Sequence, residues 1–492
     1  MARKTTLLWI GGALLAGCAT TGTGEAAREI RTVTAMSQAE RQQGAEAHPQ
    51  LLAEFGGLYE GPQAAYVTSV GRRIAVQSSL SNQQNDFTIS LLNSQVNNAF
   101  AIPGGYVYVT RQLLALMNDE AELAGVLGHE VGHVAAQHSK QRQAAASRNS
   151  ILGVLGQVLV GAVAGDSGIG QLLQRGIGTG AQLLTLKFSR SQEYEADDLG
   201  IRYLASAGYD PRALSSMLAS LAAQNVLDSQ TSGQNSAVPE WASTHPDPAS
   251  RVRRALVNAQ ATRSTSALRN ADMFLTNLEG LLYGEDPREG IVQGREFLHP
   301  VFRLRFTVPS GFSLQNGTQA VSIVGQNGQA QFTGSTFRGD LDAYVRGVFA
   351  SLAGQGQAPS ITLQHSTVNG LPVAYGAAQM SNQSGTRLDV TVIGYRFSPT
   401  SAYHFVMVTP AGQGMGAFSS MAGSMTRMSE AETRAIRPRR VHLVTVGRND
   451  SVSSLAARMA YDDHQVERFR VLNGLGASDA PRVGSRVKIV TY

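Results

Sequence analysis

The sequence predicts a multidomain α+β protein, in which a mainly helical domain with a small β-sheet precedes a small α+β domain and a βααβ module. Three patterns indicate this organisation. From Leu113 to about Ser139, apolar residues recur at helical spacing without a proline. From Val301 onward, apolar and polar residues alternate as in half-buried strands. The end of the chain follows the order strand, helix, helix, strand over 441–446, 452–460, 465–472 and 486–490.

Length and composition narrow the class of protein. A chain of 492 residues corresponds to about three domains. The net charge is +5, and two of the positive charges, Arg3 and Lys4, lie at the N-terminus that is predicted to be removed. The remaining protein is nearly balanced in charge, which argues against a nucleic-acid binder that relies on bulk positive charge. A hydrophobic content of 42% with 16% charged residues is typical of a globular protein. The single cysteine excludes internal disulfides and cysteine-rich zinc clusters.

The N-terminus is predicted to be a lipoprotein signal peptide over residues 1–17. A basic start is followed by an apolar run, Leu7–Leu15, that is too short to cross a bilayer. The ending Leu-Ala-Gly-Cys18 resembles the lipobox of bacterial lipoproteins, which implies lipidation of Cys18; the alternative is an ordinary secreted protein. Residues 18–48 read as a tether. Lipoproteins that stay in the inner membrane tend to carry Asp directly after the lipidated cysteine, and this chain has Ala19 there. By the sorting pattern of lipoproteins, the resemblance therefore implies attachment to the inner leaflet of the outer membrane, in the periplasm.

The elements of residues 49–284 follow in order. Ala99–Thr110 is predicted to form a hairpin at a sheet edge, because Pro103-Gly-Gly105 turns the chain ahead of four β-formers. Residues 151–186 are predicted to form a helical hairpin over the site, with membrane-surface contact as the minor alternative. A polar loop at 228–240 precedes helices at about 248–260 and 266–283, and 285–300 is predicted to be a linker.

Residues 300–430 are predicted to form a small α+β domain. Alternating strands are expected around Phe306, Val390 and Phe405, and one helix face is marked by apolar residues from Leu341 to Leu352. A second helix face is marked by apolar residues and is interpreted as core filling rather than a set of sulfur ligands; it comprises Phe418, Met421, Met425 and Met428. We find no catalytic constellation in this segment.

The module at 440–492 resembles a LysM module. The resemblance depends on Asp450-Ser-Val452, Leu472-Asn-Gly474 and Val483–Val487 in the order strand, helix, helix, strand. It implies binding to N-acetylglucosamine-containing glycan, here peptidoglycan, and the alternative is a purely structural role. The module departs from the pattern where Gly447–Ser451 stretches the usual turn, and where Val483 stands in place of a common proline.

The strongest chemical signal is the run His129-Glu-Val-Gly-His133. Two histidines at i and i+4 project from one face of a helix, so one tetrahedral Zn²⁺ can bind a ring nitrogen of each. Glu130 lies beside the first histidine and is assigned as general base and later acid, because its carboxylate can take a proton from a water molecule that Zn²⁺ acidifies. The alternative is a pair of surface or capped core histidines.

A catalytic zinc ion needs a third protein ligand, and a second predicted helix offers one. This helix opens at 189–197 with acidic residues one turn apart. Glu193 can supply the third ligand, and Asp197 can hydrogen-bond the outer nitrogen of a ligating histidine and fix its tautomer. Glu195 points off that face and is expected to be solvated or salt-bridged.

Four blocks together resemble the zinc metallopeptidase family of the CAAX prenyl endopeptidase, HtpX and the BepA-like periplasmic proteases. They are Asn98–Val109, Asp119–Leu123 leading into the histidine motif, Ser189–Asp197, and Thr244-His-Pro246 with Arg251. The resemblance implies a zincin-type peptidase domain over 49–284, one Zn²⁺ per chain with Glu193 as third ligand, and endoproteolysis. It also implies that the strand near Tyr106–Val109 is a sheet edge, where a substrate peptide adds as a further strand. This chain lacks the helical-repeat domain of BepA, which leaves client recognition open.

Two further histidines lie near the motif. His138 follows His133 by five positions, off the ligand face, and is expected at the surface. His245 lies in a Ser-Thr-His-Pro turn from which a loop can swing it over the metal, either as a resting cap or as a donor to the developing oxyanion; the alternative is a structural turn residue.

The sequence therefore predicts a lipid-anchored periplasmic zinc endopeptidase that degrades misfolded or mis-assembled envelope proteins. Its expected partners are polypeptide substrates, the membrane through Cys18 and peptidoglycan through 440–492, with no nucleic acid. Two alternatives stay open: a peptidoglycan hydrolase, and a non-catalytic, chaperone-like lipoprotein.

Overall fold

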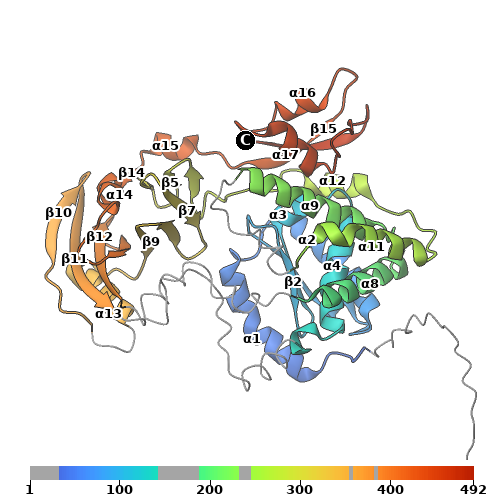
Figure 1. Ribbon diagram of the computed structural model, residues 1–492, viewed down its shortest axis with the longest axis horizontal. Coiled ribbons are helices and arrows are strands. Elements are labelled where there is room, and N and C mark those ends of the chain that lie inside the picture. Colours follow the sequence, from blue (N-terminus) through green and yellow to red (C-terminus); the bar gives the residue numbers. More distant parts are fainter. Residues whose placement is uncertain (1–32, 142–187, 232–244, 354–357, 382–385) are drawn as a thin grey trace, which may run out of the picture. The chain divides into compact units, whose positions relative to one another are not determined.

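The computed structural model describes residues 33–141, 188–231, 245–353, 358–381 and 386–492, which form helices and sheets (Figure 1). The predicted signal peptide with Cys18 and the predicted hairpin at 151–186 lie outside these residues. The predicted tether, 18–48, is helical from Gln38 onward. None of the helices in the described ranges has both the length and the apolar character needed to cross a membrane.

The first part of the described chain is mainly helical, as predicted. Its elements are α1 Gln38–Glu54, α2 Gln63–Ala75, β1 Thr88–Leu92, β2 Ala99–Ile102, β3 Tyr106–Thr110, α3 Arg111–Leu116, α4 Glu120–Ala135, α8 Arg190–Ser206, α9 Ala213–Thr231, α11 Pro248–Ala261 and α12 Ala271–Leu278. Two short 3₁₀ turns, Val76–Ser78 and Gln84–Asp86, lie between α2 and β1. The predicted polar loop at 228–240 is therefore helical up to Thr231, and the predicted helix at 266–283 is shorter.

The three-stranded sheet has the order β1-β3-β2. Strands β2 and β3 form the predicted antiparallel hairpin, and Gly104 and Gly105 turn the chain with φ of 94° and 86°. The prediction that Tyr106–Val109 is a sheet edge is wrong, because β1 pairs in parallel with the other side of β3. Parallel pairing needs a long crossover connection, which no local pattern reveals. The edge strand of the hairpin is β2.

The helix predicted from Leu113 to Ser139 is two helices. Thr110 caps α3, and Asp119 caps α4 by accepting a hydrogen bond from the backbone N–H of Glu122. Helix α4 ends at Ala135, and Gln137 has a left-handed φ of 55°. The chain therefore turns back directly after the histidine motif.

Helices α4 and α8 pack closely because glycines lie where they cross. A Cβ at Gly132 would lie 3.1 Å from the Leu199 Cβ and 3.2 Å from the Ala196 oxygen. A Cβ at Gly200 would lie 3.1 Å from the His129 nitrogen. The two backbones approach more closely than larger residues would permit, so the side chains of one helix can reach those of the other.

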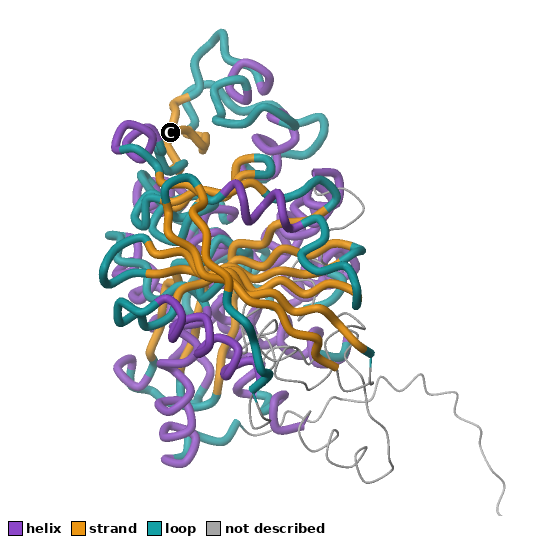
Figure 2. The backbone as a smooth tube through the Cα atoms, turned by 90° about the vertical axis from the view of Figure 1, so that its left-hand side faces the viewer, coloured by secondary structure: helices purple, strands orange, loops and turns teal. Residues whose placement is uncertain are grey.

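The chain after α12 is richer in strands. They are β4 Ile291–Gln293, β5 Glu296–His299, β6 Leu304–Thr307, β7 Phe312–Asn316, β8 Val321–Gly325, β9 Gly328–Gly334, β10 Gln364–Val368, β11 Leu371–Ser381, β12 Arg387–Arg396, β13 Ala402–Pro410 and β14 Thr426–Arg427, with helices α13 Leu341–Ala353, α14 Phe418–Ser424 and α15 Glu430–Ala435. The strands form a seven-stranded sheet, β10-β11-β12-β13-β9-β8-β7, and a four-stranded sheet, β14-β6-β5-β4. Figure 2 shows the strands in orange, fanned as in a twisted sheet.

Several predictions for this segment are confirmed and one is wrong. The predicted helix corresponds to α13, and its apolar face is buried against β11 and β12. The stripe from Phe418 to Met428 is buried, as core filling requires, but the helix predicted there ends at Ser424, and Thr426 and Arg427 form β14 instead. The predicted linker at 285–300 contains β4 and β5, because Ile291, Phe297 and Leu298 pair into the smaller sheet.

The last elements are β15 Arg440–Thr445, α16 Val452–Ala456, α17 Gln465–Leu472 and β16 Arg486–Thr491, in the predicted order. Val441 belongs to the hydrophobic core of the first part of the chain. Lys488 is 0% exposed, and its Nζ donates to the backbone oxygens of Ala115 and Met117, at the end of α3. Burial lowers the pKa of Lys488 to about 7. These elements therefore pack directly on the segment that precedes α4.

Candidate metal centre

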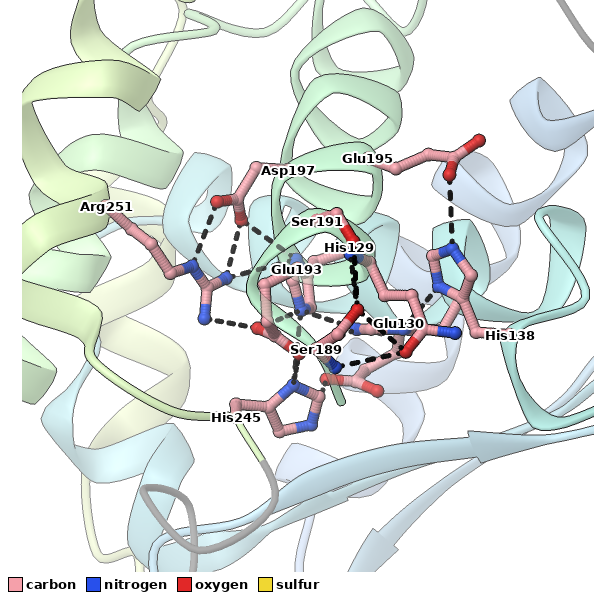
Figure 3. Close-up of polar contacts among 12 residues, drawn as sticks. His129, Glu130, His138, Ser189, Ser191, Glu193, Glu195, Asp197, His245 and Arg251 are labelled. Carbon is pink, nitrogen blue, oxygen red and sulfur yellow. Dashed lines mark hydrogen bonds and ion pairs between the residues drawn. The ribbon is translucent and has the colours of Figure 1, made fainter. Parts of the chain in front are cut away.

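Three segments far apart in the sequence bring their polar side chains together in one buried place (Figure 3). His129 and His133 lie one turn apart on α4. Glu193 comes from the first turn of α8, whose N-cap Ser189 forms a capping box with Gln192. His245 precedes α11. Each of the four, His129, His133, Glu193 and His245, is at most 3% exposed.

These four residues offer one ligand atom each, and the four atoms lie within 4.8 Å of one another. Nε2 of His129 is 3.0 Å from Nε2 of His133. Glu193 lies 3.6 Å from the first of these nitrogens and 3.4 Å from the second. Nδ1 of His245 is 3.0 Å from Oε1 of Glu193 and 3.4 Å from Nε2 of His129. The structure thus brings the three predicted ligands together and adds His245 to them.

Glu130 lies beside this cluster, as the sequence predicts. Its carboxyl group is 2% exposed, and its Oε1 is 3.5 Å from Nε2 of His245. Burial raises the pKa of Glu130 above its ordinary value, while His245 and His129 partly offset that effect. A carboxyl group with a raised pKa is suited to accept a proton and return it near neutral pH.

Asp197 connects the cluster to Arg251, which lies on α11. Oδ1 of Asp197 is 3.0 Å from Nδ1 of His129, on the side of that ring away from the other ligands. Arg251 donates to both carboxylate oxygens of Asp197, from Nε at 2.9 Å and from Nη2 at 2.6 Å. Nη1 of Arg251 also forms an ion pair with Glu193. The guanidinium group therefore bridges the predicted third ligand and the predicted partner of the first.

The charges around Glu193 keep it ionised. Burial alone would raise its pKa, but His245 and Arg251, together with the hydrogen bonds from His133 and His245, hold that pKa well below its ordinary value. Burial lowers the pKa of His133 well below its ordinary value. An ionised carboxylate beside a neutral imidazole is the protonation state that metal ligands need.

The donor set fits Zn²⁺. Imidazole nitrogens and a carboxylate oxygen are the ligands that zinc takes in catalytic sites. Among the described residues, Oε1 of Glu130 is buried without a hydrogen-bond partner, whereas Oε2 of Glu193 is ion-paired with Nη1 of Arg251. A buried acceptor such as Oε1 of Glu130 calls for an ion or a water molecule. His129, His133 and Glu193 would hold the ion, and His245 is placed to join them.

The prediction that His138 lies at the surface is wrong. This residue is 0% exposed, and its Nδ1 lies 2.8 Å from Nδ1 of His133. The prediction assumed that α4 continues through position 138, whereas the positive φ of Gln137 folds His138 back over the end of the helix. Glu195 is 36% exposed and so partly solvated, as predicted, and its Oε2 lies 3.4 Å from Nε2 of His138.

Sequence reasoning gave Arg251 no role beyond membership of a motif block. The signal that could have revealed it is its position one turn into a helix that follows the Thr-His-Pro turn. A buried arginine needs carboxylate partners, and the acids of 189–197 are the ones that the sequence places at the same site.

Residues 62–258 match the sequence model of Peptidase family M48, which confirms the family resemblance. The chain is 30% identical over 241 residues to the "Beta-barrel assembly-enhancing protease" of Yersinia pestis, covering 48% of this chain and 47% of that protein. It is 30% identical over 233 residues to the "Mitochondrial metalloendopeptidase OMA1" of Schizosaccharomyces pombe, covering 46% and 64%. It is 34% identical over 198 residues to the protein of the same name from Arabidopsis thaliana, covering 39% and 36%. The chain thus spans less than two thirds of the length of each of these relatives.

Proposed function

Because residues 62–258 match the sequence model of Peptidase family M48, we propose that this chain is a zinc-dependent endopeptidase that cleaves envelope proteins. The observation that carries the proposal is the buried cluster of four ligand atoms within 4.8 Å, with the Glu130 carboxyl group beside it. A binding protein without catalysis would have no need of that carboxyl group.

The residues of the chain divide the work of peptide hydrolysis. Zn²⁺ held by these residues would polarise the scissile carbonyl and acidify a water molecule. Glu130 is placed to accept a proton from the attacking water and to return it to the departing amine. Asp197 accepts a hydrogen bond from Nδ1–H of His129, so that Nε2 of His129 keeps its lone pair for the metal. Arg251 holds both Asp197 and Glu193 in the positions these roles require.

His245 is proposed to cap the metal at rest. Its Nδ1 lies at hydrogen-bond distance, 3.0 Å, from Oε1 of Glu193. Its Nε2 lies 3.5 Å from Oε1 of Glu130. A histidine that ligated here would fill the position that a catalytic zinc ion keeps open for water or substrate. The alternative role, a donor to the developing oxyanion, requires His245 to move away from Glu193.

The substrates are proposed to be misfolded or mis-assembled envelope proteins, in keeping with the name of the Yersinia pestis relative. Strand β2 supports binding of an extended peptide, because it is an edge of the three-stranded sheet and packs near α4. The lipid anchor at Cys18, with attachment to the outer membrane in the periplasm, and glycan binding by 440–492 are proposals from the sequence motifs.

The proposal is tested by Glu130→Gln in the full chain. The amide cannot accept the proton of water, so hydrolysis of an unfolded protein substrate should be abolished while the fold and the zinc content are kept. Glu467→Gln, which changes an exposed glutamate on α17, is the control and should leave both unchanged. Near-normal turnover of Glu130→Gln with one zinc ion per chain would contradict the proposal.

A further inference from the structure

The turn after helix α4 adds a histidine to the surroundings of the metal centre. His138 lies over the last turn of α4, with its Nδ1 2.8 Å from Nδ1 of His133. Its Nε2 lies 3.4 Å from Oε2 of Glu195 on α8. Figure 3 shows His138 and Glu195 directed toward one another, to one side of the cluster. His133, His138 and Glu195 thus form one continuous polar chain that leads away from the metal position.

The nitrogen of His133 that faces the metal position determines where the protons lie along His133, His138 and Glu195. Nε2 of His133 faces Nε2 of His129 at 3.0 Å and Glu193 at 3.4 Å, so Nε2 is the atom available to a metal. A ligating nitrogen must offer a lone pair, and the neutral ring therefore carries its proton on Nδ1. This N–H donates to Nδ1 of His138. The proton of His138 is then on Nε2, from which it is donated to the Glu195 carboxylate.

The two histidines of the motif are held in different ways. The outer nitrogen of His129 meets the carboxylate of Asp197 directly, and that carboxylate is buried and paired with Arg251. The outer nitrogen of His133 meets a carboxylate only through His138, and the side chain of Glu195 is 36% exposed. Both chains end on a carboxylate, and a carboxylate at the outer end of a ligating histidine fixes its orientation and raises its basicity.

We propose that His138 is a positioning residue of the metal centre, which orients the His133 ring by a hydrogen bond and is itself held by Glu195. The proposal rests on the proposed function in one respect, that the four-residue cluster holds Zn²⁺. Without His138, the Nδ1–H of His133 would lose its acceptor in a buried place, and the ring would lose the contact that fixes its angle. The consequence is weaker zinc binding with an otherwise intact fold.

The test compares zinc dissociation constants of full-length variants by competition with a chromophoric chelator. His138→Ala should weaken zinc binding by roughly 10–100-fold, as loss of such partners does. His138→Asn places its Oδ1 close to the position of the histidine Nδ1 and keeps an acceptor for His133, so binding should stay within about threefold of the unsubstituted chain. His299→Asn is the control, because His299 is a similarly buried histidine at the end of β5 that stacks on Phe302, and zinc binding by this variant should be unchanged.

Unfolding of the zinc-free variants shows whether His138 acts only through packing. Zinc binding by His138→Ala that equals that of the unsubstituted chain would overturn the proposal. Equal losses of affinity in His138→Ala and His138→Asn, together with equal losses of zinc-free stability, would also overturn it, because packing alone would then explain both. An unsubstituted chain that binds no zinc would instead refute the proposed function, and the proposal with it.

Discussion

Replacing Arg251 by Met tests how the buried charges of the metal centre are balanced. Arg251 is 2% exposed and is paired with Asp197, through two hydrogen bonds, and with Glu193. Methionine fills much of the same volume but leaves two buried carboxylates without their cation. Removing one partner of a buried ion pair costs about 3–5 kcal/mol, and the zinc-free chain should lose that much free energy of unfolding.

The same two helices provide a matched control. Arg254 lies one turn after Arg251 on α11 and makes a similar two-bond pair with Asp198, the neighbour of Asp197. Both side chains of that second pair are 28% exposed, so water screens it, and the pair is worth about 1 kcal/mol or less. Stacking of Arg254 over Tyr194 adds about 0.5–1 kcal/mol. Arg254→Met should therefore lose about 0.5–2 kcal/mol.

Urea unfolding followed by circular dichroism, in the presence of a chelator, measures both losses. The chelator matters because bound Zn²⁺ would compensate the charge of Glu193 and reduce the difference. Equal losses for Arg251→Met and Arg254→Met, or a loss below about 1 kcal/mol for Arg251→Met, would refute the reasoning that burial makes the first pair indispensable.

Three further predictions concern the cap, the helix crossing and the acid sensitivity of the strand-rich part. His245→Ala should raise basal proteolysis and self-cleavage with zinc retained, whereas a drop in kcat of roughly 10²–10³-fold would indicate an oxyanion donor instead. Gly200→Ala should destabilise the chain by about 1–3 kcal/mol and reduce zinc occupancy, because the added Cβ would press on the His129 backbone. Gly347→Ala, at a helix position with open space around it, should stabilise the chain by about 0.5–1 kcal/mol. The opposite order of stabilities in urea unfolding would contradict this prediction. Burial lowers the pKa of His299 and of His404 to about 4. Between pH 6.5 and 4 the unfolded chain therefore binds more protons than the folded chain, and each histidine should remove roughly 3 kcal/mol of folding stability as the pH falls through that range. A free energy of unfolding that does not change with pH over this range would contradict the prediction.

The sequence was informative about the metal centre because its chemistry follows helical spacing. Residues at i and i+4 lie on the same face of any helix, whatever the tertiary structure around it. This applies to the pair His129 and His133 and to the pair Glu193 and Asp197. The structure adds the crossing of α4 and α8 at Gly132 and Gly200, which sets the distance between the two faces. A glycine inside a helix can lie against another backbone, as Gly200 does, or in open space, as Gly347 does. The local sequence therefore does not predict where two helices cross.

The errors have a common physical origin in backbone conformation and long-range pairing. A helix that ends with a left-handed residue commonly has Gly or Asn there, and Gln137 carries no such signal. The sequence therefore reveals neither where α4 ends nor that His138 folds back beside His133. The central place of β3 depends on β1, a strand that joins it in parallel from upstream. The strands within 285–300 are short, and their pairing with β6 decides their structure.

The central claim, that His129, His133 and Glu193 hold a catalytic zinc ion, is tested most directly by elemental analysis of the purified full-length chain. The unsubstituted chain should contain one zinc ion, and Glu193→Ala should contain substantially less while keeping its helical circular dichroism spectrum. Hydrolysis of an unfolded protein substrate, measured on the same samples, should fall in proportion to the zinc content. A Glu193→Ala chain that retains one zinc ion and full hydrolysis would contradict the account.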